Sequence, residues 1–330
     1  MPIKTWPASP DARTRSLRLI HLSDPHLTTV PRSEWYRLFN KRACGYWAWR
    51  RKRRHLHRPE VLDALLEDMR SLDFDHMALT GDLTQVGLPS ECQQALEWLQ
   101  QLGPPERISV VPGNHDAYRH APWHATMGLW QDYMSDESGQ AGEALFPFVR
   151  YRGQVALIGV TTAIPTPWPL ATGMLGSSQL ARLEASLLDT AVKGYFRVLM
   201  IHHPPVAGMI GWRKRLTDTA ALADVIRRAG VELVLHGHAH RALDARLSTP
   251  AGQAFVLGAP SASMTPNTGR DHAGYSIVEI TDHAARDQAP AWSIKVTRRM
   301  IDTHCSKWHF INESACLSVG AGQMPAIIRH

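Results

Sequence analysis

The chain has 330 residues, of which 44% are hydrophobic and 20% are charged, the balance of an ordinary globular protein. No apolar run approaches the roughly 20 residues that span a bilayer, and the first 17 residues lack the apolar core of a secretory signal, so we expect a cytoplasmic protein. The four cysteines have no CxxC spacing, which argues against a disulfide framework and against a thiolate zinc site.

Short apolar runs alternate with helical patterns through most of the chain. The runs predict strands at residues 17–22, 77–80, 108–111, 155–161, 197–202 and 231–235. Apolar stripes at helical spacing predict helices at residues 60–72, 90–102, 177–188 and 218–229. This alternation is typical of an α/β fold. Runs at 254–257, 274–280 and 292–296 follow with little helix between them, which predicts an antiparallel part of the sheet system.

The domain organisation follows from the same pattern. No linker divides the chain, so residues 1–300 are interpreted as a single domain. Residues 32–58 form a basic, aromatic insertion within that domain, directly after the first predicted strand and its polar end. Residues 301–330 are interpreted as a C-terminal tail without a clear structural pattern.

Polar residues that suit metal binding follow five of the predicted strands. They are Asp24 with His26, then Asp82, then Asn114 with His115, then His202 with His203, and finally His238 with His240. In an open α/β sheet the carboxyl ends of the strands face one crevice, so we expect these side chains to converge there. Carboxylate, imidazole and amide oxygen ligands suit manganese, iron or zinc. Gly81, Gly113 and Gly237 adjoin these residues and permit close backbone approaches.

The same residues belong to five short motifs in a fixed order. They read D-P-H at 24–26, G-D at 81–82, G-N-H-D at 113–116, H-H-P-P at 202–205 and G-H-A-H at 237–240. Together they resemble the ordered blocks of the calcineurin-like metallophosphoesterases, over about two thirds of the chain. The block that contains His115 is similar to the bacterial cyclic-nucleotide, or class III, phosphodiesterase branch. The resemblance implies a four-layer α/β/β/α sandwich of two mixed sheets.

The resemblance also implies a role for each matched residue. One metal ion would be bound by Asp24, His26, Asp82 and His240, and a second by Asp82, Asn114, His202 and His238. Catalysis would be hydrolysis of a phosphodiester by in-line attack of a hydroxide that bridges two manganese, iron or zinc ions, with Asp82 as the shared ligand and His115 as the general acid. Asn114 and His203 are candidates for contact with the substrate, although His203 is equally explained as a packing residue.

The basic, aromatic insertion accounts for the net positive charge of the chain. Residues 32–58 contain ten Lys or Arg residues against one acid, interleaved with six aromatic residues. Such a segment is typical of an interfacial helix on an anionic membrane, which predicts a peripheral position at the inner face of the membrane. Two alternative roles for residues 32–58 are a lid packed over the crevice and a binding surface for nucleic acid.

Three other functions compete with phosphodiester hydrolysis. The insertion favours a membrane-associated pyrophosphatase or phosphatase that acts on a lipid-linked substrate, similar to the UDP-2,3-diacylglucosamine hydrolases. Those enzymes often replace the histidine of the Gly-Asn-His block, so His115 counts against this alternative. A nuclease would use the basic segment to hold DNA. A non-catalytic scaffold is disfavoured because all five blocks keep their ligands.

Overall fold

Two six-stranded mixed sheets lie face to face in the computed structural model, which describes residues 16–27, 29–30, 41–136, 146–265, 272–283, 292–302 and 309–319. The first sheet has the order β12 (His309–Val319), β11 (Trp292–Asp302), β10 (Gly274–Asp282), β1 (Ser16–Leu22), β2 (His76–Leu79) and β3 (Ile108–Val110). The second has the order β4 (Phe148–Arg152), β5 (Val155–Gly159), β6 (Phe196–Met200), β7 (Leu233–His236), β9 (Gly252–Gly258) and β8 (Asp244–Thr249).

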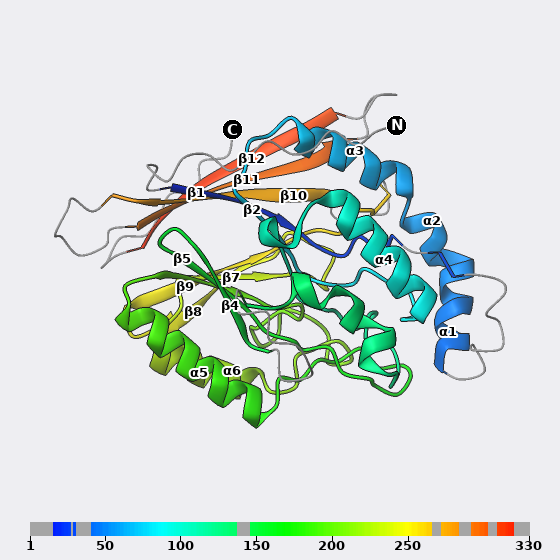
Figure 1. The fold of residues 1–330 in the computed structure, drawn as a ribbon, viewed down its shortest axis with the longest axis horizontal. Helices are drawn as coiled ribbons and strands as arrows, with labels where there is room; N and C mark the ends of the chain where they lie inside the picture. The colour runs from blue at the N-terminus through cyan, green and yellow to red at the C-terminus, as the bar shows by residue number, and fades with distance from the viewer. Residues whose placement is uncertain are drawn as a thin grey trace.

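Helices cover the outer faces of both sheets, which gives the predicted four-layer α/β/β/α sandwich (Figure 1). The first sheet carries α3 (Pro59–Arg70) and α4 (Pro89–Leu102), and the second carries α5 (Ser177–Val192) and α6 (Thr219–Ala229). Short 3₁₀ turns occupy Pro105–Arg107, Trp123–Ala125 and Met127–Tyr133. Within the described residues, no helix is both long enough and apolar enough to cross a membrane.

Strands β2, β5, β6 and β7 are buried at every position because the middle of each sheet is covered on both faces. Successive side chains of a strand point to opposite faces. In β5, Leu157 therefore joins the large core that holds residues of both sheets, such as Met77 and Leu235. Its neighbour Ile158 joins a second core, where it packs with residues of α5 and α6.

Parallel strands bring the polar strand ends to one side of each sheet. Strand β2 pairs in parallel with β1 and with β3, and β5, β6, β7 and β9 pair in parallel along the second sheet. The predicted antiparallel part is confirmed for β10 and β11. Strand β9 differs from that prediction, since it pairs in parallel with β7 and antiparallel only with β8. Residues 309–319, within the tail that had no assigned pattern, form β12 at the edge of the first sheet.

The described part of the basic insertion packs against the body of the protein. It consists of α1 (Lys41–Ala48), a π-helical turn (Trp49–Arg53) and α2 (Arg54–Leu56). The buried Arg42 donates hydrogen bonds to the carbonyls of Val86 (3.0 Å) and Gly87 (2.6 Å). Tyr46 and Trp49 pack on a small apolar cluster beside these residues. Residues 31–40 lie outside the described residues.

Candidate metal centre

Loops from both sheets meet at the carboxyl ends of the parallel strands. The amide of Asp24 donates to the carbonyl of Gly81 (3.0 Å), and that of His26 donates to the carbonyl of Asp82 (3.0 Å). Across the seam between the sheets, the amide of His238 donates to the Asp24 carboxylate (2.9 Å). The structure thereby brings all seven predicted ligands into one cluster, as the strand-end pattern predicts.

Four of the predicted ligands surround a first position. The ligand atoms of Asp24, His26, Asp82 and His240 all lie within 4.8 Å of one another. Nε2 of His240 is 3.1 Å from Oδ1 of Asp24 and 3.2 Å from Nε2 of His26. Nε2 of His26 is 3.8 Å from Oδ2 of Asp82. Atoms that share a metal ion about 2.1 Å away have separations of this order.

A second position lies on the other side of Asp82. Ligand atoms of Asp82, His202 and His238 also lie within 4.8 Å of one another. Nε2 of His202 is 3.4 Å from Oδ2 of Asp82 and 3.2 Å from the amide oxygen of Asn114. Asp82 therefore belongs to both groups, which is the arrangement expected of a bridging carboxylate.

Backbone carbonyls orient three of the ligand imidazoles. Nδ1 of His26 lies 3.2 Å from the carbonyl oxygen of Thr84, and Nδ1 of His202 lies 2.7 Å from that of Thr80. In His238 it is Nε2 that lies near a carbonyl oxygen, that of Lys214, at 2.9 Å. A ring nitrogen that donates to a carbonyl fixes the tautomer, so the opposite nitrogen keeps its lone pair for a metal ion.

Five of the predicted ligands have left-handed backbones. Positive φ occurs, among the described non-glycine residues, at Asp24, His26, Asp82, His238 and His240, with values from 43° to 65°. This conformation costs a residue with a side chain about 1–2 kcal/mol. Strain concentrated on one set of side chains is a feature of functional sites, where surrounding hydrogen bonds hold the backbone in place.

The electrostatics of the cluster favour a cation. Asp24 and Asp82 are almost fully buried. Among the described residues, Oδ1 of Asp24 accepts no hydrogen bond, and its near neighbour is Nε2 of the ligand His240 at 3.1 Å. Burial lowers the pKa of His202, but the Asp82 carboxylate outweighs burial and raises that pKa to about 9. A buried carboxylate that draws a proton onto its neighbour also attracts a metal ion. The residues present thus fit the metal ions that the sequence implies.

Comparison of the sequence with models of protein families identifies the family of this chain. Residues 17–242 match the family model of the calcineurin-like phosphoesterases. The chain belongs to this family. It is therefore a hydrolase of phosphoric esters with a metal-binding site, and all seven predicted ligands lie within the matched residues.

Individual relatives agree with the family. A probable cyclic nucleotide phosphodiesterase from Synechococcus sp. strain PCC 6301 is 28% identical over 222 residues, 66% of this chain and 76% of the relative. A second protein of that description, from Synechococcus sp. strain WH7803, is 35% identical over 96 residues, 27% of this chain and 34% of the relative.

Two solved structures are similar at low sequence identity. A dimetal phosphatase from Danio rerio superposes with a TM-score of 0.49 and 14% identity, over 92% of this chain and 99% of that one. A 5′-nucleotidase precursor from Thermus thermophilus gives a TM-score of 0.45 and 14% identity over 85% of this chain. This phosphoesterase spans about half the length of that nucleotidase, covering 54% of it.

His115, the predicted general acid, lies beside the first metal position of the phosphoesterase. Its ring is partly exposed and meets the ring of His26 edge-on, with centroids 4.9 Å apart. Nδ1 lies 2.6 Å from the carbonyl oxygen of Gln85, and the amide of His115 donates to Oδ1 of Asp82 (2.8 Å). With Nδ1–H donating to the carbonyl, Nε2 is the atom left to exchange a proton with a substrate.

Asp116 holds two ligand-bearing loops of the phosphoesterase together. Its carboxylate accepts hydrogen bonds from the amides of Asp82, Gly113 and Thr84, each at 2.9 Å. Burial, followed by the nearby charge of Asp82, raises the pKa of Asp116 to about 7. Close packing adds to this constraint, because a Cβ on Gly113 would lie 2.2 Å from Oδ1 of Asp82.

His203, a predicted substrate contact, is buried behind the second metal position. Its Nδ1 lies 2.7 Å from the Thr162 hydroxyl, and its Nε2 lies 3.3 Å from the carbonyl oxygen of Ala171. Burial and the neighbouring His202 lower its pKa to about 3. Its ring packs against that of His238, with centroids 4.3 Å apart and the ring planes tilted by 45°. These contacts favour a packing role that supports the ring of a ligand.

One histidine of the site was not singled out by the sequence. His57, near the end of the basic insertion, contributes a ring nitrogen within 4.8 Å of those of His26 and His240. It carries no motif, and it reaches the site through a β-bridge with Met264, about 200 residues away in the chain. The one feature of the sequence that could have pointed to His57 is its position in an insertion that follows the Asp24 block.

Proposed function

We propose that this phosphoesterase hydrolyses phosphodiester bonds with two metal ions, one held by Asp24, His26, Asp82 and His240 and the other by Asp82, Asn114, His202 and His238. The observation that carries the proposal is the shared carboxylate of Asp82, which belongs to both groups of ligand atoms. Donors of this kind suit manganese, iron or zinc.

Two parts of the site have different roles in the proposed reaction: the metal ligands and His115. Bound metal ions would lower the pKa of a water molecule that serves as the nucleophile, and would neutralise charge on the phosphoryl oxygens. His115, whose Nδ1 meets a backbone carbonyl, would donate a proton from Nε2 to the leaving oxygen, which matters most when that oxygen belongs to an alcohol. Its bond to the Gln85 carbonyl (2.6 Å) keeps the ring in the tautomer that this step needs.

A phosphodiester, rather than a monoester, is supported by two facts. The sequence keeps His115, whose block is similar to the cyclic-nucleotide branch, and both curated relatives are described as probable cyclic nucleotide phosphodiesterases. Cyclic nucleotides and glycerophosphodiesters are therefore the first candidate substrates.

The test is hydrolysis combined with metal analysis. Purified protein, loaded in turn with manganese, iron and zinc, is assayed on bis(p-nitrophenyl) phosphate and analysed for metal content. We expect two ions per chain and turnover with at least one metal. A chain that binds no metal and shows no turnover would be a scaffold.

A panel of cyclic nucleotides, glycerophosphodiesters, single-stranded DNA and nucleotide-activated lipids then separates phosphodiesterase, nuclease and lipid-linked pyrophosphatase activities.

We also propose that the enzyme works at an anionic membrane surface. Exposed tryptophans in the described part of the chain are Trp47, Trp168 and Trp212, each with more than half of its surface accessible. Their segments adjoin one another, since the Lys41 ammonium donates to Thr166 (3.0 Å), and the amide of Ala171 donates to the carbonyl of Arg213 (2.9 Å). Exposed indoles suit the headgroup region of a bilayer.

Cations accompany these tryptophans and suit anionic lipid. Arg50 and Arg51 are exposed near Trp47, and the exposed Arg213 and Arg215 follow Trp212. Each cation near an anionic surface contributes about 1 kcal/mol, so reversing Arg50 and Arg51 to glutamate should weaken vesicle binding by more than about tenfold. Flotation with phosphatidylglycerol vesicles measures this, and Arg227→Glu with Arg228→Glu on α6 is the control. Equal binding by both double variants, or none by the wild type, would contradict the proposal.

A further inference from the structure

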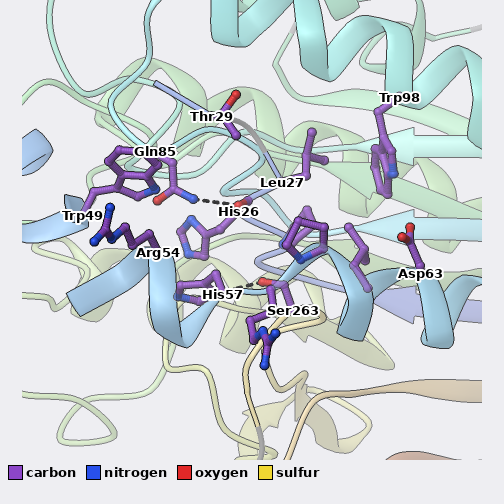
Figure 2. A pocket seen from close by; sticks show the side chains of 14 residues that line it. His26, Leu27, Thr29, Trp49, Arg54, His57, Asp63, Gln85, Trp98 and Ser263 are labelled. Atoms are coloured by element: carbon purple, nitrogen blue, oxygen red, sulfur yellow. Dashed lines mark hydrogen bonds between the residues drawn. The ribbon is translucent and has the colours of Figure 1, made fainter. Parts of the chain in front are cut away.

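A pocket opens directly beside the first metal position. Its volume is about 270 Å³. Figure 2 shows His26 and His57 near its middle, with Trp49 and Arg54 at one end and Asp63 and Trp98 at the other. The pocket thus joins a ligand of the candidate metal centre to side chains of the basic insertion. A substrate whose phosphoryl group reaches the metal centre would extend the rest of its structure into this space.

His57 is held firmly in the wall of the pocket. It is buried, with 7% of its surface exposed, and its Nδ1 lies 2.8 Å from the hydroxyl of Ser263 and 3.4 Å from that of Ser261. The Ser261 hydroxyl in turn donates to the carbonyl of Asp24 (2.7 Å). These contacts connect the His57 ring to the loop that carries the first metal ligands. A hydroxyl that donates to Nδ1 leaves the second ring nitrogen as a hydrogen-bond donor.

Arg54 brings a positive charge to the same pocket, and its Nε donates a hydrogen bond to Nε2 of His55 (3.0 Å). Its side chain is exposed, and no carboxylate among the described residues forms an ion pair with it. The other arginine of the lining, Arg58, is 3.4 Å from Glu60. Asp63 is the one acidic residue among the described residues that line the pocket, and it lies at the end opposite Arg54 (Figure 2). The end with Trp49 and Arg54, which adjoins His57 near the middle of the pocket, is therefore the positive end.

We propose that this end of the pocket is a binding site for a second phosphate group of the substrate, contacted by Arg54 and His57, with Trp49 against the organic part. The proposal rests on the proposed phosphodiesterase function and narrows its substrates to molecules with a phosphate beyond the scissile one. A guanidinium and an imidazole N–H both bind phosphate oxygens through strong hydrogen bonds. An indole face packs well against a nucleobase or another flat group.

The geometry favours an anion site over a further ligand for the first metal ion. His57 groups with His26 and His240, but the group that contains the two carboxylates does not include it. His57 thus does not reach every ligand atom of the first metal position, since the 4.8 Å criterion places it with the two histidines alone. His26, His57 and Arg54 all line the same pocket, so an anionic group bound there shares one space with the metal-binding cluster and with Arg54.

The experiment compares two substrates that share one scissile bond. Thymidine 5′-(p-nitrophenyl phosphate) and its 3′-phosphorylated form both release p-nitrophenol and differ only in a second phosphate. We expect the wild type to favour the 3′-phosphorylated form in kcat/KM by about tenfold, the scale of one charge-assisted contact. Arg54→Ala and His57→Gln should each bring this ratio close to one. Arg70→Ala, at an exposed position of α3 that does not line the pocket, should keep the wild-type ratio.

Binding and metal content separate the possible failures. Calorimetry with thymidine 3′,5′-bisphosphate and thymidine 5′-monophosphate should show the same preference in the wild type and its loss in both variants. Hydrolysis of both substrates without preference would overturn the second-phosphate site and leave the phosphodiesterase intact. If neither substrate is hydrolysed, the proposed function is rejected. The calorimetric comparison of the two nucleotides would still test the second-phosphate site. If His57→Gln loses metal while remaining folded by circular dichroism, His57 is a metal ligand and the proposal is wrong.

Discussion

The candidate metal centre and the wall formed by residues 41–58 border the same space but are held in different ways. The metal-centre side chains are mostly buried, lie on loops at strand ends, and include five residues with left-handed backbones. The wall consists of short helical pieces with exposed cations, attached through Lys41, Arg42 and backbone contacts to residues 263–265. A rigid framework suits the chemical step, and a peripheral wall suits selectivity because it can change without disturbing that step.

The strongest test of the metal centre is Asp82→Asn, which removes the shared charge with little change in shape. We expect loss of bound metal and a fall in kcat/KM on the order of a thousandfold or more, because the activated water depends on the metal ions. Elemental analysis and bis(p-nitrophenyl) phosphate hydrolysis measure both effects. Asp224→Asn, an exposed position on α6, is the control. Full metal content in Asp82→Asn would show that this carboxylate is not a bridge.

His115→Ala should separate catalysis from metal binding. We expect unchanged metal content and a fall in kcat of about 10²–10⁴-fold on esters of poor leaving groups, the usual range for a general acid. The loss should be smaller on p-nitrophenyl esters, whose leaving group needs little protonation. The exposed His124→Ala serves as the matched control. An equal loss on both classes of ester would argue against proton donation by His115.

Asp116→Asn should weaken the framework without removing a ligand. The asparagine amide would place N–H groups against backbone donors that the carboxylate now satisfies. We expect a loss of about 1–3 kcal/mol in the free energy of unfolding, measured in urea. Metal affinity should fall by about 10–100-fold, as for other supporting contacts. Wild-type stability would mean that the two loops do not depend on this carboxylate.

Arg42→Met should affect the wall and leave the metal centre alone. The substitution leaves the carbonyls of Val86 and Gly87 without their partner. We expect faster limited proteolysis within residues 41–58, unchanged metal content, and a loss of about 1–2 kcal/mol in overall stability. Activity should change less than in the three variants above. If metal is lost as well, the wall and the centre form one cooperative unit.

These two regions also differ in how far the sequence alone could describe them. The seven ligands follow buried strands with clear apolar runs, so their convergence follows from sheet geometry. Strands β8 and β12 escaped prediction because they lie at sheet edges, where exposed side chains leave no apolar run. His57 escaped because its position depends on Ser263 and Met264, which no local pattern connects to it. The contacts that bury His203 likewise come from loops distant in sequence.

The seam between the two sheets runs through the candidate metal centre. Asp24, His26, Asp82 and Asn114 belong to loops of one sheet, and His202, His238 and His240 belong to loops of the other. Bound ions would therefore link the loops of one sheet to the loops of the other, and so stabilise the contact between the two sheets. By mass action, an ion present at a hundred times its dissociation constant adds about 2.7 kcal/mol per site to folding stability. Chelation should thus lower the melting temperature, which makes metal supply a determinant of how long the folded enzyme survives.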